Sequence, residues 1–421
     1  MDFWASLHPI LFLLLLLSTP LVSPRDAKVN EIMKSAPLID GHNDLALQLR
    51  RYFNNNLTAV DLKTLNKTYT NINKLKEGNV GAQLWSAYVL CSAQYKDAVR
   101  LTLEQIDVIK RMCRKYPEFK LVTSSKDIEN TEKISCLISI EGGHSIDSSL
   151  AALRMFYELG VRSMSLTHNC HTPWARSAIP HASSVPPKTS LTDFGQEVVW
   201  EMNRLGMIID LSHTAIDTAK AVLQISKAPV IFSHSSAYAI CQNPRNVPDE
   251  LLKMIKQGDS LVMVNFHSGF VACQKLSNIS RVADHFDHIK KIAGYESVGI
   301  GGDYDGAIGF PQGLEDVSKY PALIEELLRR NWMEEELKAV LRDNFLRVFR
   351  KVETVKEELK DDTASEVEIP FKDIINTSCR LNLKDPFPPS NLGHSLSKTM
   401  PHAFTIICTV IRYIISIILT G

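Results

Sequence analysis

The sequence predicts an α/β protein with a closed (β/α)8 barrel. The first observation is a rhythm: short β-branched, apolar runs alternate with segments whose apolar residues recur at helical spacing. This alternation predicts a parallel sheet, and about eight such units favour a closed barrel. The second observation is that many of the apolar runs stop at a histidine or a carboxylate. Because the C-terminal ends of barrel strands share one mouth, this pattern predicts a single active site.

The expected elements follow in order along the chain. The first strand precedes His42, and the second is the run 82–90, after a polar, Asn-rich segment (52–79) that we expect to be a loop. Helical spacing first covers 97–115. Strands and helices then alternate: 137–140 with 148–159, 163–167 with 194–205, 207–211 with 215–224, 230–233 with 249–257, 261–266 with 279–292, and 298–300 with helices after 320.

Composition excludes one class of partner. The 421-residue chain carries 47 basic and 47 acidic side chains, a formal net charge of zero, and no basic stripe. Nucleic acid is therefore not an expected partner. We expect one catalytic domain over 24–354, because barrels of this type routinely exceed roughly 250 residues as a single unit.

The N-terminal segment 1–23 predicts a cleaved signal peptide. Its apolar part, residues 10–17, is too short to span a bilayer, and serine and proline residues follow it. The chain is therefore expected to enter the secretory pathway.

The C-terminal end predicts a glycosylphosphatidylinositol (GPI) anchor on the outer face of the plasma membrane. Residues 355–395, rich in Glu, Asp, Pro and Ser, are expected to form an exposed stalk, and 396–421 an apolar propeptide that is removed. Asn391 is the expected attachment site, with Ser395 as the alternative. The competing interpretation is a tail-anchored helix, for which about 17 apolar residues containing an arginine are marginal.

Internal features agree with an extracellular protein. Four Asn-X-Ser/Thr triplets are acceptors for N-glycosylation: Asn56, Asn66, Asn278 and Asn376. The chain has eight cysteines, which can pair in an oxidising compartment. Cys408 lies in the removable tail, so seven remain, and an odd number indicates a buried thiol or a bond between subunits. Cys379, which follows the last helix, is the expected intermolecular cysteine.

Five of the residues at strand ends predict a two-metal site: His42, Asp44, Glu141, His213 and His234. Each alone is more often a hydrogen-bonded core or turn residue, but five at the ends of several strands indicate one shared site. Imidazole and carboxylate ligands suit zinc, and the set is too large for one catalytic zinc with an open position. We therefore expect two Zn²⁺ about 3.5–4 Å apart, bridged by Glu141, that hold a shared water and lower its pKa.

Further residues are candidates for the remaining chemistry. Asp303, in Gly-Gly-Asp-Tyr-Asp-Gly, is the expected proton carrier for the leaving amine, although Asp305 competes for that role or caps the next turn. His168 is a candidate to stabilise the oxyanion, and Arg245 to hold a substrate carboxylate with its planar guanidinium. Taken alone, His168 and Arg245 also have an ordinary structural interpretation.

Seven motifs resemble the membrane dipeptidase (renal dipeptidase) family, in order and at family spacing, over roughly residues 36–351. They are Ile39-Asp-Gly-His-Asn-Asp44, Ile140-Glu-Gly-Gly-His-Ser-Ile-Asp147, Leu166-Thr-His-Asn-Cys170, Asp210-Leu-Ser-His213, Val230-Ile-Phe-Ser-His-Ser-Ser236, Asn243-Pro-Arg-Asn-Val-Pro248 and Gly301-Gly-Asp-Tyr-Asp-Gly306. The resemblance implies an amidohydrolase-like (β/α)8 barrel in a dizinc, GPI-anchored, disulfide-linked homodimeric ectoenzyme. It also implies cleavage of dipeptides, including cysteinylglycine-type products of glutathione conjugates and leukotriene D4; some members open β-lactams.

The resemblance assigns a role to each matching residue. His42 and Asp44 would bind the first zinc ion, and Glu141 would bridge to the second. The second ion would be held by His213 and His234. Substrate contacts and proton transfer would fall to His168, Arg245 and Asp303.

The resemblance also implies a cysteine pattern. Cys91 would pair with Cys170, and Cys241 with Cys273. Cys379 would link two subunits. Cys113 and Cys136 would be free.

The chain departs from the family at one position near the substrate site. The best-characterised members share Met-Val-Asn-Phe and then carry a tyrosine where this chain has His267. The departure leaves the preferred dipeptide open, whereas every metal-ligand position is filled.

Three functions follow from these observations. The leading one is a zinc-dependent dipeptidase at the cell surface. The second is a catalytically weak paralogue that serves as a surface receptor or scaffold, against which the intact ligand set argues. The third is a metallohydrolase of another small amide, such as a β-lactam, which the ligand residues alone do not separate from the first.

Overall fold

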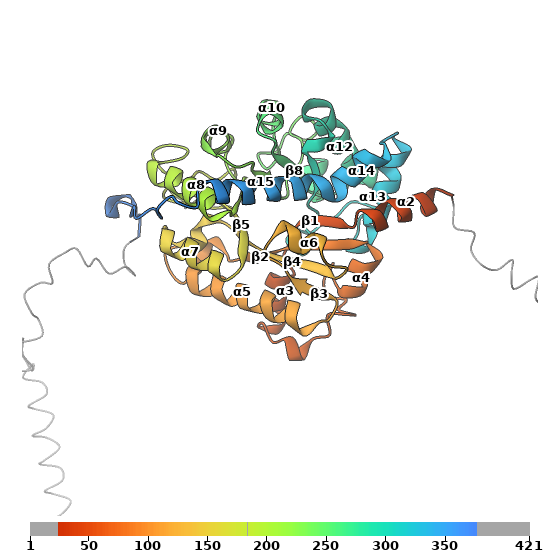
Figure 1. Ribbon diagram of the computed structural model, residues 1–421, viewed down its shortest axis with the longest axis horizontal. Helices are drawn as coiled ribbons and strands as arrows, with labels where there is room; N and C mark the ends of the chain where they lie inside the picture. The colour runs from red at the N-terminus through yellow and green to blue at the C-terminus, as the bar shows by residue number, and fades with distance from the viewer. Residues whose placement is uncertain (1–23, 183, 377–421) are drawn as a thin grey trace, which may run out of the picture. The chain divides into compact units, whose positions relative to one another are not determined.

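Eight parallel strands close into a barrel in the computed structural model, which describes residues 24–182 and 184–376 (Figure 1). The sheet follows the order β2-β1-β9-β8-β7-β6-β5-β4-β3, and an additional pairing of β2 with β4 closes the ring. The strands are β1 Leu38–Asn43, β2 Val80–Tyr88, β3 Phe119–Leu121, β4 Ile134–Glu141, β5 Val161–Ser165, β6 Ile208–Asp210, β7 Ile231–Phe232, β8 Leu261–Val264 and β9 Val298–Ile300. The short β3 pairs with the start of β4, outside the ring of eight. The predicted (β/α)8 barrel is confirmed.

Helices surround the barrel on the outside. The α-helices are α2 Pro24–Ser35, α3 Leu45–Phe53, α4 Ile72–Glu77, α5 Ala98–Lys115, α6 Ser125–Glu129, α7 Leu150–Glu158, α8 Asp193–Leu205, α9 Ile216–Ile225, α10 Asp249–Gln257, α11 Ser268–Val271, α12 Ile279–Ala293, α13 Tyr320–Arg329, α14 Glu334–Lys338 and α15 Asn344–Glu358. Local signals set several ends: the Thr192 side chain accepts a hydrogen bond from Gly195 N at the start of α8, and Gly206 ends that helix at φ 76°.

All strand pairs in the ring are parallel, so their C-terminal ends lie at one mouth. The longest ladder joins β2 to β4 and ends with Tyr88 opposite Glu141. This register places the last residue of β2 beside the last residue of β4. The strand ends that the sequence pattern singles out therefore converge, as expected for a parallel barrel.

The opposite end of the barrel is closed by α15. Phe345, Phe349 and Val352 of this helix form one buried cluster with barrel-lining side chains such as Ile39 and Leu84. Figure 1 shows α15 crossing the barrel between α8 and α14. Burial of these side chains supplies apolar packing where the barrel interior would otherwise meet water. The N-terminal end of the barrel is therefore a packed core.

Several boundaries differ from the sequence-based expectation. The segment 52–79 is not only a loop, because it contains α4, which begins where the Asn71 side chain accepts a hydrogen bond from Lys74 N. The last helix continues to Glu358, past the expected boundary at 354. The segment after α15 remains in contact with α7 and α8. Ser365 Oγ donates to Glu197 Oε2 (2.8 Å), and the Ser365 carbonyl accepts from Arg154 Nη1 (3.0 Å). Polar composition alone does not reveal such specific anchoring.

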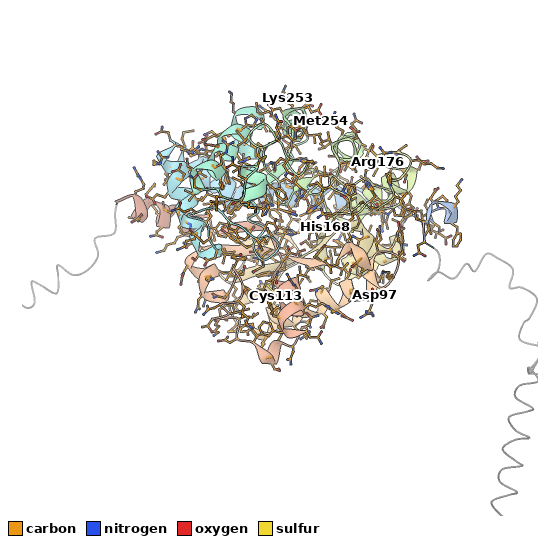
Figure 2. All side chains as sticks on the ribbon, turned by 180° about the vertical axis from the view of Figure 1, so that it is seen from behind. Asp97, Cys113, His168, Arg176, Lys253 and Met254 are labelled. Atoms are coloured by element: carbon orange, nitrogen blue, oxygen red, sulfur yellow. A yellow bond between two sulfur atoms is a disulfide. The ribbon has the colours of Figure 1, made fainter. Side chains whose placement is uncertain are left out.

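The cysteine pattern requires one correction. Cys91–Cys170 and Cys241–Cys273 pair as the resemblance implies. Cys113 and Cys136, expected to be free, form a third disulfide. The reason is packing, because α5 lies against β3 and β4 and brings the two Cα atoms within 6.5 Å. Figure 2 labels Cys113 in the part of the molecule that holds α5.

Some predictions fall on the ends of the chain. No helix within the described residues is long and apolar enough to cross a membrane. The expected signal peptide, Cys379, Asn391, Ser395 and the tail 396–421 lie outside the described residues. The four expected glycosylation acceptors are described and are exposed: Asn56, Asn66, Asn278 and Asn376.

Candidate metal centre

The predicted ligand residues meet at the C-terminal mouth of the barrel. His42 lies on β1, and Asp44 precedes α3. Glu141 ends β4. His213 and His234 follow β6 and β7 within three residues. All five side chains are buried, with residue exposures of 1–8%.

Glu141 is the centre of this cluster. Its Oε1 lies 3.1 Å from His213 Nε2, 3.3 Å from His234 Nε2 and 3.5 Å from His42 Nε2. His42 Nε2 is also 3.1 Å from Asp44 Oδ2. One carboxylate oxygen thus faces three imidazole nitrogens, so these four side chains are placed to share bound metal.

The hydrogen-bond partners of His213 and His234 turn their free nitrogens toward this point. Asn169 Oδ1 faces His213 Nδ1 at 3.0 Å and accepts its proton. Ser233 Oγ donates to Asp210 and so accepts from His234 Nδ1 at 2.8 Å. Each Nε2 therefore carries a lone pair, and the two lone pairs face each other across 3.0 Å. Such a contact is repulsive without a cation between or beside the nitrogens, so the donor set fits bound metal.

Charge and burial support the same interpretation. Burial lowers the pKa of His213 and of His234 well below 6.5, so both imidazoles are neutral, as metal ligands must be. Burial lowers the pKa of His42 as well, but the charges of Glu141 and Asp44 outweigh it and raise this pKa to about 10 in the metal-free site. Asp44 Oδ1 is buried and has no hydrogen-bond partner among the described atoms. The cluster is thus short of positive charge, which divalent cations would supply.

The structure separates the two competing aspartates. Asp303 faces the cluster, close enough to His42 and His234 to share one ion. Its Oδ2 accepts from Asn265 Nδ2 (2.9 Å), and burial raises its pKa to about 6. Asp305 Oδ1 instead accepts from Tyr69 N (2.8 Å) and so fastens the segment before β2. Of the two aspartates, Asp303 is therefore the one that faces the ligand cluster.

Gly306 lets the two carboxylates approach the turn. A Cβ at this position would lie 2.1 Å from Asp44 Oδ2 and 2.6 Å from Asp303 Oδ1. Asp303 itself adopts the left-handed φ of 62°, which is uncommon for a residue other than glycine. The turn after β9 is thus shaped around the site.

The remaining predicted residues line the same mouth. Arg245 is 4% exposed and donates to His234 O (3.1 Å) and Ser235 Oγ (3.2 Å), while its Nε has no partner among the described atoms. His267 precedes α11, and its ring packs against Phe270 at 4.6 Å. Phe270 also lies under the Arg245 guanidinium at 5.4 Å. Arg245 and His267 therefore pack against the same Phe270 ring at the mouth.

His168 stands beside the cluster and Figure 2 labels it near the middle of the molecule. Its Nε2 is 3.9 Å from Glu141 Oε1, longer than the distance to any of the other three histidines. Burial lowers its pKa well below 6.5. The residue is neutral and next to the predicted reaction centre.

Five supporting residues were not assigned a role from the sequence: Tyr88, Asn169, Asp210, Ser233 and Asn265. Asn169, Asp210 and Ser233 lie inside the recognised motifs, so those motifs carried a signal for them. Tyr88 ends β2, the one barrel strand without a predicted site residue, and Asn265 follows β8. With them, each of the eight barrel strands contributes a polar side chain to the mouth.

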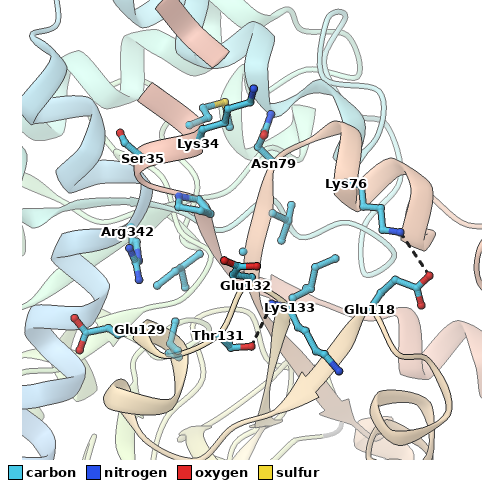
Figure 3. A pocket seen from close by; sticks show the side chains of 17 residues that line it. Lys34, Ser35, Lys76, Asn79, Glu118, Glu129, Thr131, Glu132, Lys133 and Arg342 are labelled. Carbon is cyan, nitrogen blue, oxygen red and sulfur yellow. Dashed lines mark hydrogen bonds and ion pairs between the residues drawn. The ribbon is translucent and has the colours of Figure 1, made fainter. Parts of the chain in front are cut away.

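Two other groupings of the described residues do not compete with this site. Cys91, His144 and Cys170 lie close together, but the two cysteines are bonded to each other. A cavity of about 590 Å³ lies at the N-terminal ends of β1, β2 and β4, lined by residues such as Lys34, Asn79 and Arg342 (Figure 3). Barrel enzymes place their chemistry at the other end of the strands.

Comparisons with known proteins agree with the site. A family model described as "Membrane dipeptidase (Peptidase family M19)" matches residues 26–363. Dipeptidase 3 of Mus musculus is 54% identical over 347 residues, which cover 82% of this chain and 70% of the mouse protein. Dipeptidase 3 of Homo sapiens is 51% identical over 366 residues, covering 87% and 75%.

Two solved structures show the same fold. The dipeptidase AC, a metallopeptidase of family M19, superposes with a TM-score of 0.70 at 27% identity, covering 75% of this chain and 98% of that one. A metallopeptidase from Rhodobacter sphaeroides, bound to a phosphinate mimic of the dipeptide L-Ala-D-Ala, superposes with a TM-score of 0.68 at 26% identity, covering 75% and 99%.

Proposed function

The chain belongs to the membrane dipeptidase family and is a metallodipeptidase, and we propose that it hydrolyses dipeptides at the cell surface with two bound zinc ions. One observation carries the proposal: a single Glu141 oxygen faces the lone pairs of His213 and His234, and His42 Nε2 lies close to both this oxygen and Asp44. Neutral imidazoles with carboxylates are a donor set that suits zinc.

His42 and Asp44 would hold one ion, His213 and His234 the other, and Glu141 would bridge them. Bound there, the two ions would lower the pKa of a water and polarise the scissile carbonyl. Asn169 and Ser233 keep the ligand histidines in the tautomer that binds metal. Asn169 and Ser233 therefore contribute by orienting the two ligand histidines.

Asp303 would carry the proton. Its carboxyl group is buried beside the cluster, and its raised pKa of about 6 lets it accept a proton from the nucleophile and release it to the leaving amine near neutral pH. Asn265 holds one of its oxygens and leaves the other free for transfer. This proton transfer suits the cleavage of an amide bond, because the amine leaves only after it has been protonated.

Arg245 would recognise the free carboxylate of the dipeptide. Its guanidinium is buried at the mouth, so a carboxylate bound there would form a charge-assisted hydrogen bond away from water. His168 would donate to the oxygen that becomes negative in the transition state. If these two residues and His267 close the substrate space, the substrate would be limited to two residues.

Cysteinylglycine-type dipeptides and leukotriene D4 are the proposed natural substrates. Because His267 borders the substrate space, we expect its replacement to change the preference among dipeptides. His267→Tyr, compared with the unmodified chain on one panel that includes D-residues at the C-terminal position, should shift relative kcat/KM values and leave bound metal unchanged. A panel profile identical in both proteins would remove His267 from the specificity site.

We also propose secretion, GPI anchoring at Asn391 and a homodimer linked through Cys379. Three disulfides occupy six of the eight cysteines, which leaves Cys379 and Cys408. The segment that precedes Cys379 carries three exposed apolar side chains: Val367, Phe371 and Ile375. Non-reducing electrophoresis of the full-length protein, with Cys379→Ser as the matched variant, should show a dimer that this variant loses.

The central experiment measures dipeptide hydrolysis and bound metal in one sample of the full-length protein. We expect about two zinc ions per chain and turnover on the dipeptide panel, with both lost in Glu141→Ala. Two zinc ions without turnover on any dipeptide would support the scaffold function, and turnover of a β-lactam alone would support the third function. One ion per chain with full activity would contradict the dizinc proposal.

A further inference from the structure

Tyr88 is the last residue of β2 and contacts His168. Its hydroxyl lies 3.3 Å from His168 Nδ1, and the two ring centroids are 4.5 Å apart. Tyr88 is 9% exposed. The contact places a phenol directly behind the imidazole that borders the metal cluster.

The direction of this hydrogen bond follows from the other neighbours. His168 Nδ1 has one further close neighbour, Cys91 Sγ at 3.9 Å, which carries no proton because Cys91 is bonded to Cys170. The Tyr88 hydroxyl has no other protein partner among the described residues. If the phenol donates to Nδ1, both buried groups are satisfied; if Nδ1 donates, the phenol proton has no protein acceptor.

Donation by Tyr88 has a consequence on the far side of the ring. A neutral imidazole that accepts at Nδ1 carries its proton at Nε2. That Nε2 points at the cluster, 3.9 Å from Glu141 Oε1. A phenol has an ordinary pKa of about 10, so it is protonated and able to donate at physiological pH.

We propose that Tyr88 is a positioning residue that fixes His168 as the Nε2–H tautomer, so that His168 is a hydrogen-bond donor to substrate and not a metal ligand. The inference rests on the proposed function of His168 for its catalytic meaning, but the tautomer itself does not depend on turnover.

The surrounding structure holds the pair in place. The disulfide Cys91–Cys170 ties the chain three residues after Tyr88 to the chain two residues after His168. Ser177 Oγ donates to the His168 carbonyl. Tyr88 also pairs in register with Glu141 on the neighbouring strand. The phenol, the imidazole and the carboxylate are thus fixed relative to one another by backbone and covalent links.

The first test observes the tautomer directly. Nitrogen-15 NMR of histidine side chains in the metal-free full-length protein, with His168 assigned by His168→Gln, should show a neutral ring protonated at Nε2. Tyr88→Phe keeps the aromatic ring and removes the donor, so the His168 signals should shift toward a mixture of tautomers. A ring protonated at Nδ1 in the unmodified protein would overturn the proposal.

The second test measures kinetics and bound metal. Tyr88→Phe should lower kcat by about 10- to 100-fold, in the range of supporting groups around metal sites, and leave the metal content unchanged. On a His168→Ala background, Tyr88→Phe should cost nothing further, because the two act as one unit. Tyr116→Phe is the matched control: among the described residues the buried Tyr116 hydroxyl bonds only to Leu62 N and Val60 O, so kcat should be unchanged in this variant.

The outcomes distinguish a failure of the positioning role of Tyr88 from a failure of the proposed function. Additive losses in the double variant, or loss of metal in Tyr88→Phe, would overturn the positioning role. If the unmodified protein cleaves no dipeptide, the proposed function fails, while the NMR result still decides the tautomer.

Discussion

The two ends of the barrel are built on opposite principles. At the N-terminal end, Phe345 and Phe349 of α15 pack into an apolar cluster with the barrel lining. At the C-terminal mouth, buried histidines and carboxylates face one another, Asp44 Oδ1 lacks a partner, and His213 and Asp303 adopt left-handed φ values of 67° and 62°. The difference teaches that this fold fills one end of the barrel with apolar side chains and keeps unsatisfied, strained groups at the other, where chemistry needs them.

Removal of metal gives the largest expected effect, because the mouth depends on cations that the packed end does not need. Dialysis against a strong chelator should reduce dipeptide hydrolysis to background and added Zn²⁺ should restore it. Because the ions bind only the folded chain, the free energy of unfolding should fall by about 3–4 kcal/mol relative to protein at 100 to 1,000 times the dissociation constant in free zinc. Calorimetry with and without chelator measures this; equal stability in both would show that the cluster does not bind metal in the folded state.

Asp303→Asn should have the next largest effect. The amide cannot carry a proton, so kcat should fall by about 10²- to 10⁴-fold while bound metal is retained. In the unmodified protein the pKa of Asp303 is raised to about 6, so its carboxylate form is present above that pH and activity should decline as the pH falls through it. The pH profile of the variant should lack this decline. Asp305→Asn is the comparison: a comparable kcat loss there would reverse the assignment of the two aspartates.

Asn169→Ala should have an intermediate effect. Removing its side chain frees His213 Nδ1, so the ligand tautomer is no longer fixed, and metal affinity should fall by about 10- to 100-fold. Competition with a zinc-binding dye measures the affinity, and activity should recover at excess zinc. A kcat that stays low at saturating zinc would mean that Asn169 acts on substrate and not through His213.

Phe349→Ala should have the smallest effect on catalysis and a large effect on stability. Phe349 is fully buried in α15, so truncation leaves a cavity that should lower the free energy of unfolding by about 3–5 kcal/mol. Because this residue lies at the end opposite the metal cluster, kcat/KM per folded molecule should stay within about twofold of the original value. Urea titration measures the loss of stability, and an activity assay at low temperature measures kcat/KM. A large loss of kcat/KM in the folded variant would break the division between the two ends.

The sequence predicted the parts of the site that depend on position relative to a strand end. His42, Glu141, His213 and His234 each follow or end an apolar run, and parallel strands carry such residues to one mouth whatever the details of packing. The structure brings these side chains together as that argument requires. Recognition of the family motifs added the roles that spacing alone leaves open.

Other features depended on contacts between distant segments. Tyr88 and His168 are 80 residues apart in sequence, and neither the strand pattern nor the motifs pair them. The packing of α5 against β3 and β4 brings Cys113 and Cys136 together as a disulfide. The number of cysteines in the sequence could not predict this pairing. The polar composition of residues 355–395 likewise did not predict that Ser365 is hydrogen-bonded to Glu197 and Arg154.

By itself, then, the sequence determined the barrel, its metal-binding mouth and the family, because apolar period and strand-end residues are local properties of the chain. The tertiary structure alone decided which of Asp303 and Asp305 faces the ligand cluster, which groups orient its histidines, and what closes the other end. These are set by hydrogen-bond direction and side-chain packing between elements far apart in sequence, and such contacts exist only once the barrel has closed.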